Sequence, residues 1–434
     1  MNETSSKLQQ GIGLPQAIAL YIGAVLGSGV LIVPGLAAEM AGPASLLAWG
    51  FMTLLILPMA LSMGLLSAKY PNAGGVSHFV TLAYGERTGT LIGWFFLMSV
   101  PIGAPVAALT GAGYLTAALG LGEGAKIAVA AAMLAIGLFT NWIGMQLAGK
   151  IQIAVVIAIA AVLIFSFAAA LPRMESVHFT PFVPHGWLSV GQAASMLFWC
   201  FIGWEAVSHM SEEFKDPQKA AIKGVTAAAI IVGILYFMSA LATVGTQSYL
   251  KSGSESSMVW IISQPLGSWG GIIAGVTGLF ICMASIIAYS GAAARVAYAM
   301  AREGKAPKWW SMLSLRFHTP VGALIFLMLC FAVVMLLYGT GTLSLATLIQ
   351  FPNATFILTY MGGCAAGIRL LKGNRAGVVI SWISFAATAA VFPFTGWAMI
   401  YPLLITLFFL FFQIRGGRRR LASGDAQTTK ETTA

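Results

Sequence analysis

The chain has 434 residues, of which 59% are hydrophobic and only 8% are charged, and its mean hydropathy is +0.87. A single soluble core cannot hold so large an apolar fraction, so the composition excludes a water-soluble enzyme or binding module and indicates a polytopic membrane protein. The net charge of +10 does not indicate nucleic-acid binding, because no segment combines a solvated basic face with interleaved aromatic side chains.

The N-terminus has no pattern of a cleaved signal peptide. Its first ten residues, MNETSSKLQQ, are polar, and the apolar run after them is too long and has no small-residue cleavage site. We therefore expect residues 1–10 to form a short cytoplasmic segment and the first apolar run to be retained as a membrane span. Cysteine usage predicts neither a disulfide framework nor a metal site, because all four cysteines lie in apolar runs without ligand spacing.

Twelve apolar runs are long enough to cross about 30 Å of hydrocarbon, which takes about 20 residues of helix. The predicted spans are 13–38, 44–67, 90–118, 126–145, 149–170, 188–210, 222–246, 269–299, 321–338, 343–366, 376–393 and 396–414. The last two are separated only by a short turn around FPFTG. The expected fold class is thus an all-α membrane protein with twelve transmembrane helices.

Basic residues predict the orientation of these spans, because short loops rich in lysine and arginine stay on the cytoplasmic side. With the N-terminus inside, only Lys126, Arg173 and Lys251 fall outside, and the other twenty of the 23 basic residues fall inside. We therefore expect both termini in the cytoplasm, including a basic and then polar tail over 416–434. The net charge is accounted for by this topology.

The first span contains AVLGSGVLIVPG, residues 24–35, in which small and helix-breaking residues lie at mid-membrane depth. Gly27 and Gly29 each disfavour a helix interior by roughly 1 kcal/mol relative to alanine, and Pro34 removes a helical hydrogen bond. Unwound backbone inside a membrane must be buried in protein or line a wet cavity, so this pattern predicts an interrupted helix beside a cavity. The alternative is that the small residues simply let a neighbouring helix pack closely.

The sixth span repeats the pattern, with Gly203 at its centre and Glu205 two residues later in MLFWCFIGWEAVSHMSEEFKDP. Two interrupted spans in the first and sixth positions are what an inverted repeat of five plus five helices would give. Half-helix N-termini bind carboxylates, and exposed carbonyls bind ammonium groups, so the pair of breaks fits the zwitterion of an α-amino acid.

Four motifs in order resemble those of the amino acid–polyamine–organocation superfamily of transporters: GSGV, YPNAGGVSHF, FIGWEAVSHMSEEFKDP and MAREGKAP. Within it, the chain resembles most the bacterial exporters of methionine and branched-chain amino acids. The similarity covers roughly residues 11–415. It implies a LeuT-like fold with repeats over about 13–170 and 188–366, followed by two extra helices over about 376–414.

The resemblance also implies a binding site made mainly of backbone. It places the substrate carboxylate on the amides of Gly27, Ser28 and Gly29, and the ammonium against the carbonyls of Val25, Trp199 and Ile202. The Ser28 hydroxyl has an alternative role, bonding to the preceding helical turn. Similar transporters often have a gating aromatic side chain at the position of Tyr289; for Trp199 and Tyr289 a generic role in the membrane core remains open.

Glu205 is the one carboxylate placed well inside a span, where an ionisable group is costly and is by default a functional candidate. Similar transporters often carry a proton-responsive acid here, so Glu205 is a candidate for proton coupling, with a bridge between the broken helices as the alternative. His209, four residues later, can approach it on a resumed helix; an ordinary interfacial histidine is the competing interpretation. In the tenth span, Asn353 is expected to hydrogen-bond between helices or to line the pathway.

No cofactor is predicted, and the expected driving force is a proton gradient. The fifth span, IQIAVVIAIAAVLIF, lacks the lysine that some superfamily members place there, and no cluster of Asp, Asn and Thr suggests a sodium cage. The membrane interior offers few acids for a cationic substrate, and the third span, with Pro101 and Pro105, offers only apolar or small residues to a side-chain pocket. A neutral aliphatic or thioether amino acid is the better match.

The sequence therefore predicts a secondary transporter of neutral amino acids in a bacterial inner membrane, working by alternating access, with export as the expected direction and uptake or exchange as the alternative. An intramembrane enzyme would need several polar groups converging on one site. A channel would need rings of carbonyls or charges along a continuous pore, and the chain has no Walker motif for an ATP-driven pump. The expected partners are a small amino acid and the lipid bilayer, with no nucleic acid; the sequence does not indicate an oligomeric state.

Overall fold

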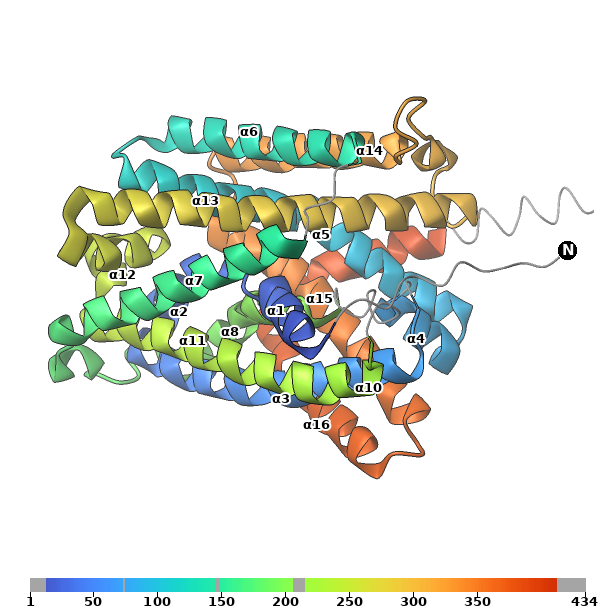
Figure 1. Cartoon of the computed structure of the whole chain (residues 1–434), viewed down its shortest axis with the longest axis horizontal. Coiled ribbons are helices and arrows are strands. Elements are labelled where there is room, and N and C mark those ends of the chain that lie inside the picture. Colours follow the sequence, from blue (N-terminus) through green and yellow to red (C-terminus); the bar gives the residue numbers. More distant parts are fainter. Residues whose placement is uncertain (1–12, 73–74, 145–148, 206–214, 412–434) are drawn as a thin grey trace, which may run out of the picture.

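The computed structural model describes residues 13–72, 75–144, 149–205 and 215–411, and over these residues the chain is helical without a strand. Most of the long helices run along the long axis of the molecule (Figure 1). The helices of the first half are α1 (Leu14–Val25), α2 (Gly29–Ala41), α3 (Ser45–Lys69), α4 (Gly75–Tyr84), α5 (Glu86–Ala118), α6 (Glu123–Trp142), α7 (Gly149–Ala170) and α8 (Trp187–Leu197). Those of the second half are α10 (Pro217–Lys219), α11 (Val225–Thr246), α12 (Ser248–Lys251), α13 (Ser257–Arg302), α14 (Val321–Gly339), α15 (Leu345–Leu370), α16 (Arg375–Val391) and a last helix over 400–411.

Eight helical stretches of the described residues are long and apolar enough to cross a membrane, and two shorter apolar helices accompany them. Arg375–Phe411 contains two predicted spans, the eleventh and the twelfth, because a tight turn rather than a loop joins them. Gly29–Lys69 contains the second half of the first predicted span together with the second span. The two shorter helices, Leu14–Val25 and Trp187–Phe201, are the halves of spans that are interrupted. The multi-span membrane class is confirmed, and the count of twelve spans remains a prediction.

Two local features differ from the expected spans. Residues 75–84, which we expected to lie in a connection, form α4, whose short amphipathic sequence buries Val76, Phe79 and Val80. The eighth span begins earlier than residue 269, because α13 runs from Ser257 and bends at Gly267, where φ is +57°. Glycine tolerates this left-handed conformation.

The predicted turn around FPFTG is confirmed, with another left-handed glycine at Gly396.

Glycines let the two central helices α5 and α13 pack closely. A Cβ atom added to Gly275 would lie 3.0 Å from the Leu115 Cα atom, and one added to Gly278 would lie 3.0 Å from the Tyr114 ring. Small residues permit this backbone approach between membrane helices, where packing rather than water exclusion drives association. Helix α2, the second half of the first span, contacts both of them.

One end of the bundle, called here the Lys305 end, gathers basic loops. Lys305 forms ion pairs with Glu86 at 2.7 Å and with Glu303 at 2.6 Å, which ties the start of α5 to the loop after α13. Lys69 donates to the carbonyl of Leu370 at 2.8 Å. The structure thus brings together three loops that the charge pattern predicts on the same side of the membrane.

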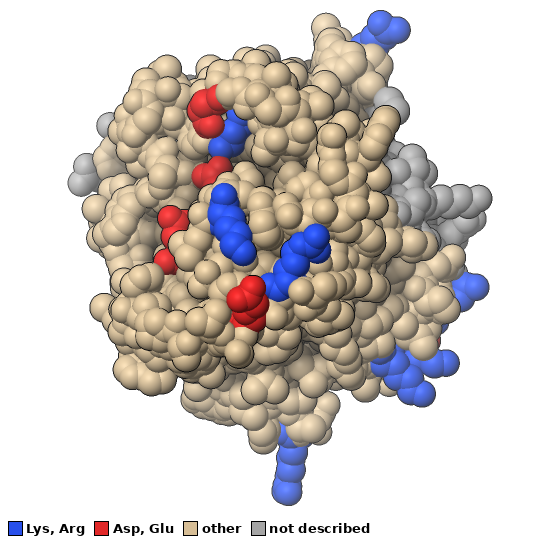
Figure 2. Space-filling model, turned by 90° about the vertical axis from the view of Figure 1, so that its left-hand side faces the viewer, with Lys and Arg blue, Asp and Glu red and all other residues tan. Residues whose placement is uncertain are grey.

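The opposite end, called here the Lys126 end, carries acidic and basic side chains near the middle of its face (Figure 2). Lys126, at the start of α6, is 6% exposed and lies 2.7 Å from the Glu255 carboxylate and 3.4 Å from that of Glu123. Its ammonium also donates to the Tyr338 hydroxyl at 2.7 Å. Next to this cluster, the 3₁₀ turn η7 (Ser254–Ser256) packs closely on α2. A Cβ atom at Gly35 would lie 1.9 Å from the Ser254 carbonyl oxygen.

Candidate functional site

The first span is interrupted at residues 26–28. Helix α1 ends at Val25, Leu26 leaves the helical conformation, and α2 begins at Gly29. The Gly27 N–H donates back to the Val25 carbonyl at 2.8 Å, which closes a tight turn. The first N–H groups of α2 have no carbonyl within the helix to bond, so this helix start points free donors and the positive end of its dipole into the bundle.

The sixth span is interrupted at residues 202–203. Helix α8 tightens into the 3₁₀ turn η4 (Phe198–Phe201), Ile202 is extended, and Gly203 has a φ of +130°. A residue with a Cβ atom rarely adopts this conformation, so glycine is required here. Both interruptions predicted from glycine positions are therefore confirmed.

The two interruptions lie against each other. A Cβ atom at Gly203 would lie 2.3 Å from the Ala24 carbonyl oxygen, and one at Gly29 would lie 2.9 Å from the Cys200 Sγ atom. Only glycine permits such backbone approach. The small residues therefore serve both purposes considered from the sequence: they interrupt the helices and they allow close packing.

Tyr236 of α11 ties the two interruptions together. Its hydroxyl lies 2.7 Å from the carbonyl oxygen of Val25 and 2.8 Å from that of Cys200, and its single proton can serve one of them at a time. The side chain is fully buried. Because the Val25 carbonyl also accepts from the Gly27 N–H, it is already engaged in this conformation.

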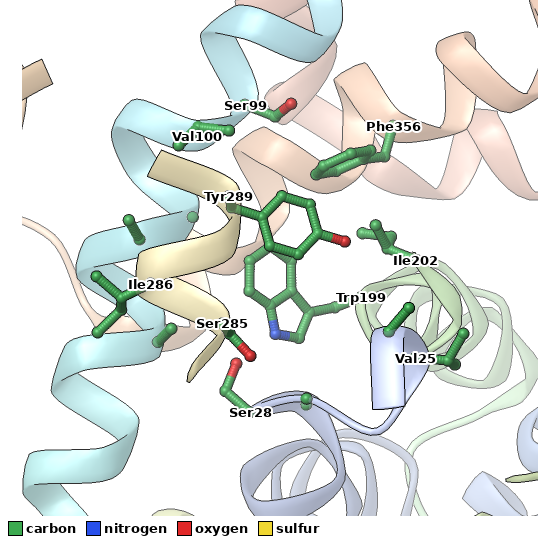
Figure 3. Close-up of a pocket in the computed structure, with 16 residues that line it drawn as sticks. Val25, Ser28, Ser99, Val100, Trp199, Ile202, Ser285, Ile286, Tyr289 and Phe356 are labelled. Atoms are coloured by element: carbon green, nitrogen blue, oxygen red, sulfur yellow. The ribbon is translucent and has the colours of Figure 1, made fainter. Parts of the chain in front are cut away.

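A cavity with about 540 Å³ of empty space lies where the two interruptions meet α5, α13 and α15. All seven residues predicted to bind substrate line it, and Figure 3 shows the side chains of the labelled residues around this space. They are Val25, Gly27, Ser28, Gly29, Trp199, Ile202 and Tyr289.

The wall of the cavity is mostly apolar or small. From α5 come Val100, Gly103, Ala104 and Ala107, on the stretch that contains its two prolines, and from the tenth span comes Phe356. Its polar side chains are neutral: serines and a tyrosine line it, and among the described residues no lysine, arginine, aspartate or glutamate does. The apolar character expected of the third span is confirmed at this site.

Trp199 reaches from the first interruption to α5. A Cβ atom at Gly29 would lie 3.0 Å from its Cδ1 atom, and one at Gly103 would lie 3.1 Å from its Cη2 atom at the far edge of the ring. Figure 3 shows its ring between Ser28 and Tyr289. The indole therefore forms one side of the cavity and limits its width.

Glu205 lies directly behind the cavity, 1% exposed, at the second interruption. Its Oε2 atom accepts from the Gly203 N–H at 2.9 Å and from the Tyr360 hydroxyl, and its Oε1 atom accepts from the Tyr289 hydroxyl at 3.4 Å. The carboxylate thus holds the unwound backbone and contacts one cavity-lining side chain. This geometry agrees with the bridging role considered for Glu205; the proton-coupling role remains a prediction.

Two other predicted residues have different outcomes. His209 lies outside the described residues. Asn353, on α15, is buried and donates to the carbonyls of Ser195 at 3.3 Å and Met196 at 3.2 Å, so the predicted helix–helix hydrogen bond is confirmed. It does not line the cavity.

Several residues at the site were not predicted from the sequence. Tyr236 and Tyr360 hold the interruptions, and Ser285, Ile286 and Phe356 line the cavity. The only signal in the sequence was a tyrosine in the middle of an otherwise apolar run. A tyrosine buried at that depth needs a hydrogen-bond partner, and unwound backbone supplies one.

Comparison with known proteins identifies the family. The amino acid permease family matches residues 12–422. The chain belongs to this family. It is 36% identical over 415 residues to the amino acid permease YecA of Bacillus subtilis, covering 95% of this chain and 98% of the relative.

Other relatives of this permease have names that state a substrate. It is 30% identical over 404 residues to the L-methionine/branched-chain amino acid exporter YjeH of Escherichia coli, covering 92% of this chain and 95% of the relative. It is 28% identical over 336 residues to the branched-chain amino acid permease BcaP of Bacillus subtilis, covering 72% and 71%. The predicted superfamily and the predicted similarity to an exporter of methionine and branched-chain amino acids are confirmed. The relatives are transporters rather than enzymes.

Proposed function

We propose that this permease transports neutral amino acids of the methionine, leucine, isoleucine and valine type by alternating access, and that it exports them. The observation that carries the proposal is the cavity at which both interrupted spans meet, where every described lining side chain is uncharged. Export is favoured by the similarity to an exporter over 92% of the chain. Uptake or exchange of branched-chain amino acids is the alternative, favoured by the similarity to a permease over 72%.

The proposed binding mode uses backbone dipoles. The substrate carboxylate would bind the free N–H groups at the start of α2, around Ser28 and Gly29. The ammonium would face carbonyls of the second interruption, at Trp199 and Ile202, rather than the Val25 carbonyl, which Gly27 and Tyr236 already contact. The side chain would extend between Val100, Phe356 and Ile286.

The proposed coupling uses Glu205. Protonation of its Oε2 atom would remove an acceptor from the Gly203 N–H and the Tyr360 hydroxyl, and would loosen the second interruption from α15. Tyr289, which touches both the cavity and Glu205, would transmit substrate binding to this carboxylate. No cofactor is needed in this scheme, and a proton gradient would drive it.

The proposed architecture is the LeuT-like one: twelve membrane helices, two inverted repeats of five over about 13–170 and 188–366, and two further helices. The location would be a bacterial inner membrane with both termini in the cytoplasm, so that the Lys305 end faces inward and the Lys126 end faces outward. The basic loops gathered at the Lys305 end support this orientation.

Flux measurements in proteoliposomes test the function. Vesicles loaded with labelled methionine, leucine or arginine are assayed for efflux with and without a pH gradient. We expect methionine and leucine efflux that responds to the gradient, and little arginine efflux. Efflux of arginine alone would overturn the substrate class, and neutral amino acid flux without any pH response would overturn proton coupling only.

The Glu205→Gln variant tests the proposed proton site. The amide keeps the shape but cannot gain a proton, so we expect substrate binding with an affinity near that of the native protein and flux that no longer responds to pH. Glu39→Gln, which changes an exposed carboxylate at the other end of α2, is the matched control. A full pH response in Glu205→Gln would remove Glu205 from the coupling scheme.

A further inference from the structure

A groove lies between α6 and α14 and shares no lining residue with the substrate cavity. The two helices run next to each other (Figure 1), and the groove between them holds about 1040 Å³ of empty space. Every described side chain that lines it is apolar, including Leu138 and Phe139 of α6 and Met328 and Phe331 of α14.

The shape of the groove follows from small residues opposite large ones. Ala131 and Ala135 of α6 line it, where larger side chains would fill the space. Phe139 is 54% exposed and Met328 is 49% exposed, so large apolar side chains flank an open channel. Both helices belong to stretches that are apolar enough to cross a membrane. The groove between them is therefore open to the hydrocarbon core of the bilayer.

One end of the groove carries cationic side chains. Trp142, the last residue of α6, lines the groove, its carbonyl accepts from Thr319 at 2.6 Å, and its ring lies 5.6 Å from that of Phe317. The Arg316 guanidinium lies 5.2 Å from the Phe317 ring, and this side chain is exposed.

A second arginine lies beside the same end of α6. A Cβ atom at Gly291 would lie 2.3 Å from the Asn141 Oδ1 atom and 3.4 Å from the Arg295 Nη1 atom, which places Arg295 next to the last turn of α6. No acidic side chain of the described ranges is within ion-pair distance of Arg295 or Arg316. The opposite end of the groove differs, because Lys126 there is already paired with Glu255.

We propose that this groove binds one acyl chain of an anionic phospholipid, whose phosphate is held by Arg316 and Arg295. An apolar groove that follows α6 from Ala131 to Trp142 accepts a hydrocarbon chain. The two arginines at one end complement the negative charge of a phosphate. Trp142 lies at the same end, and tryptophan is common at the headgroup level of membranes. Arginine suits a phosphate because its planar guanidinium donates two parallel hydrogen bonds. The lipid comes from the leaflet at the Lys305 end.

Native mass spectrometry of the full chain, purified in detergent and supplied with defined lipids, tests this proposal. The probes are phosphatidylglycerol and phosphatidylcholine with identical acyl chains. We expect one phosphatidylglycerol to be retained per chain, at least about fivefold more than phosphatidylcholine. In the double variant Arg295→Gln with Arg316→Gln, this preference should disappear, whereas the control Arg87→Gln with Arg375→Gln, which removes the same charge elsewhere, should keep it.

The groove itself is tested with Ala135→Leu, which fills the channel with three added carbon atoms. We expect retention of both lipids to fall at least about fivefold with the melting temperature unchanged. Equal retention of the two lipids by the native chain, or an undiminished phosphatidylglycerol preference in the double arginine variant, would overturn the proposal. A stable dimer that cross-links through Met328→Cys would also overturn it, because a second copy of the chain would then occupy the groove.

Discussion

Gly203 packs directly on the carbonyl group of Ala24: a Cβ atom at position 203 would lie 2.3 Å from that oxygen and 2.7 Å from its carbon. The contact joins the end of α1 to the interruption of the sixth span. With Gly29 against Cys200, it makes the two interruptions one compact backbone structure, and the substrate cavity opens beside it.

The first prediction concerns this contact. In Gly203→Ala, the new Cβ atom meets backbone that cannot move aside, and the φ of +130° is strained for alanine by roughly 1–3 kcal/mol. We expect a clear fall in melting temperature and loss of most substrate binding, measured by thermal shift and by equilibrium binding of the transported amino acid. Gly50→Ala is the control, since its Cβ atom would meet nothing within 4 Å. Native-like binding in Gly203→Ala would show that the contact is not needed.

The second prediction concerns Tyr236, whose hydroxyl serves the carbonyls of Val25 and Cys200. Tyr236→Phe keeps the ring and removes one buried hydrogen bond, which is worth about 1 kcal/mol. We expect a modest loss of stability and a larger loss of transport rate, because both interruptions lose their shared donor. Tyr249→Phe is the matched control, since its hydroxyl has no hydrogen bond within the described part of the chain. Equal effects of the two variants on transport would contradict the assignment.

Sequence alone predicted the interruptions because their signal is local. Glycines at 27, 29 and 203 stand out in apolar runs, and the cost of glycine in a helix does not depend on distant residues. The seven cavity-lining predictions followed from those positions and the family resemblance. Lys126 and Glu255 are 129 residues apart, so their pairing depends on how helices pack and no local pattern predicts it. Helix α4 was missed because ten residues are too few to stand out from a loop, and packing on α5 and α15 stabilises them.

The third prediction concerns the width of the cavity. Trp199 extends between Gly29 and Gly103, so Trp199→Leu should enlarge the space available to the substrate side chain. We expect the transport of phenylalanine relative to methionine to rise about tenfold, the scale on which apolar pockets discriminate by size. Competition assays in proteoliposomes measure this ratio. Trp187→Leu, at a site that is 68% exposed, should leave it unchanged. An unaltered ratio in Trp199→Leu would remove the indole from size selection.

The fourth prediction concerns the ion pairs at the Lys126 end. Lys126→Met leaves the Glu255 and Glu123 carboxylates without their shared cation, and we expect a loss of stability on the order of 1–3 kcal/mol, below the value for a fully buried pair because Glu255 is partly exposed. The combination with Glu255→Gln should cost less than the two single changes added together. Thermal unfolding of the four proteins measures this coupling, and Lys372→Met, at an exposed turn, is the control. Strict additivity would mean that the pair contributes nothing.

The central claim is that peptide groups at two touching interruptions bind both charged ends of an amino acid. An experimental structure with the transported amino acid bound tests it most directly. We predict the substrate carboxylate within about 3.2 Å of the amide nitrogens of Ser28 or Gly29, and its ammonium equally near a carbonyl oxygen of Trp199 or Ile202. A substrate held by charged side chains, or bound away from these two segments, would contradict it.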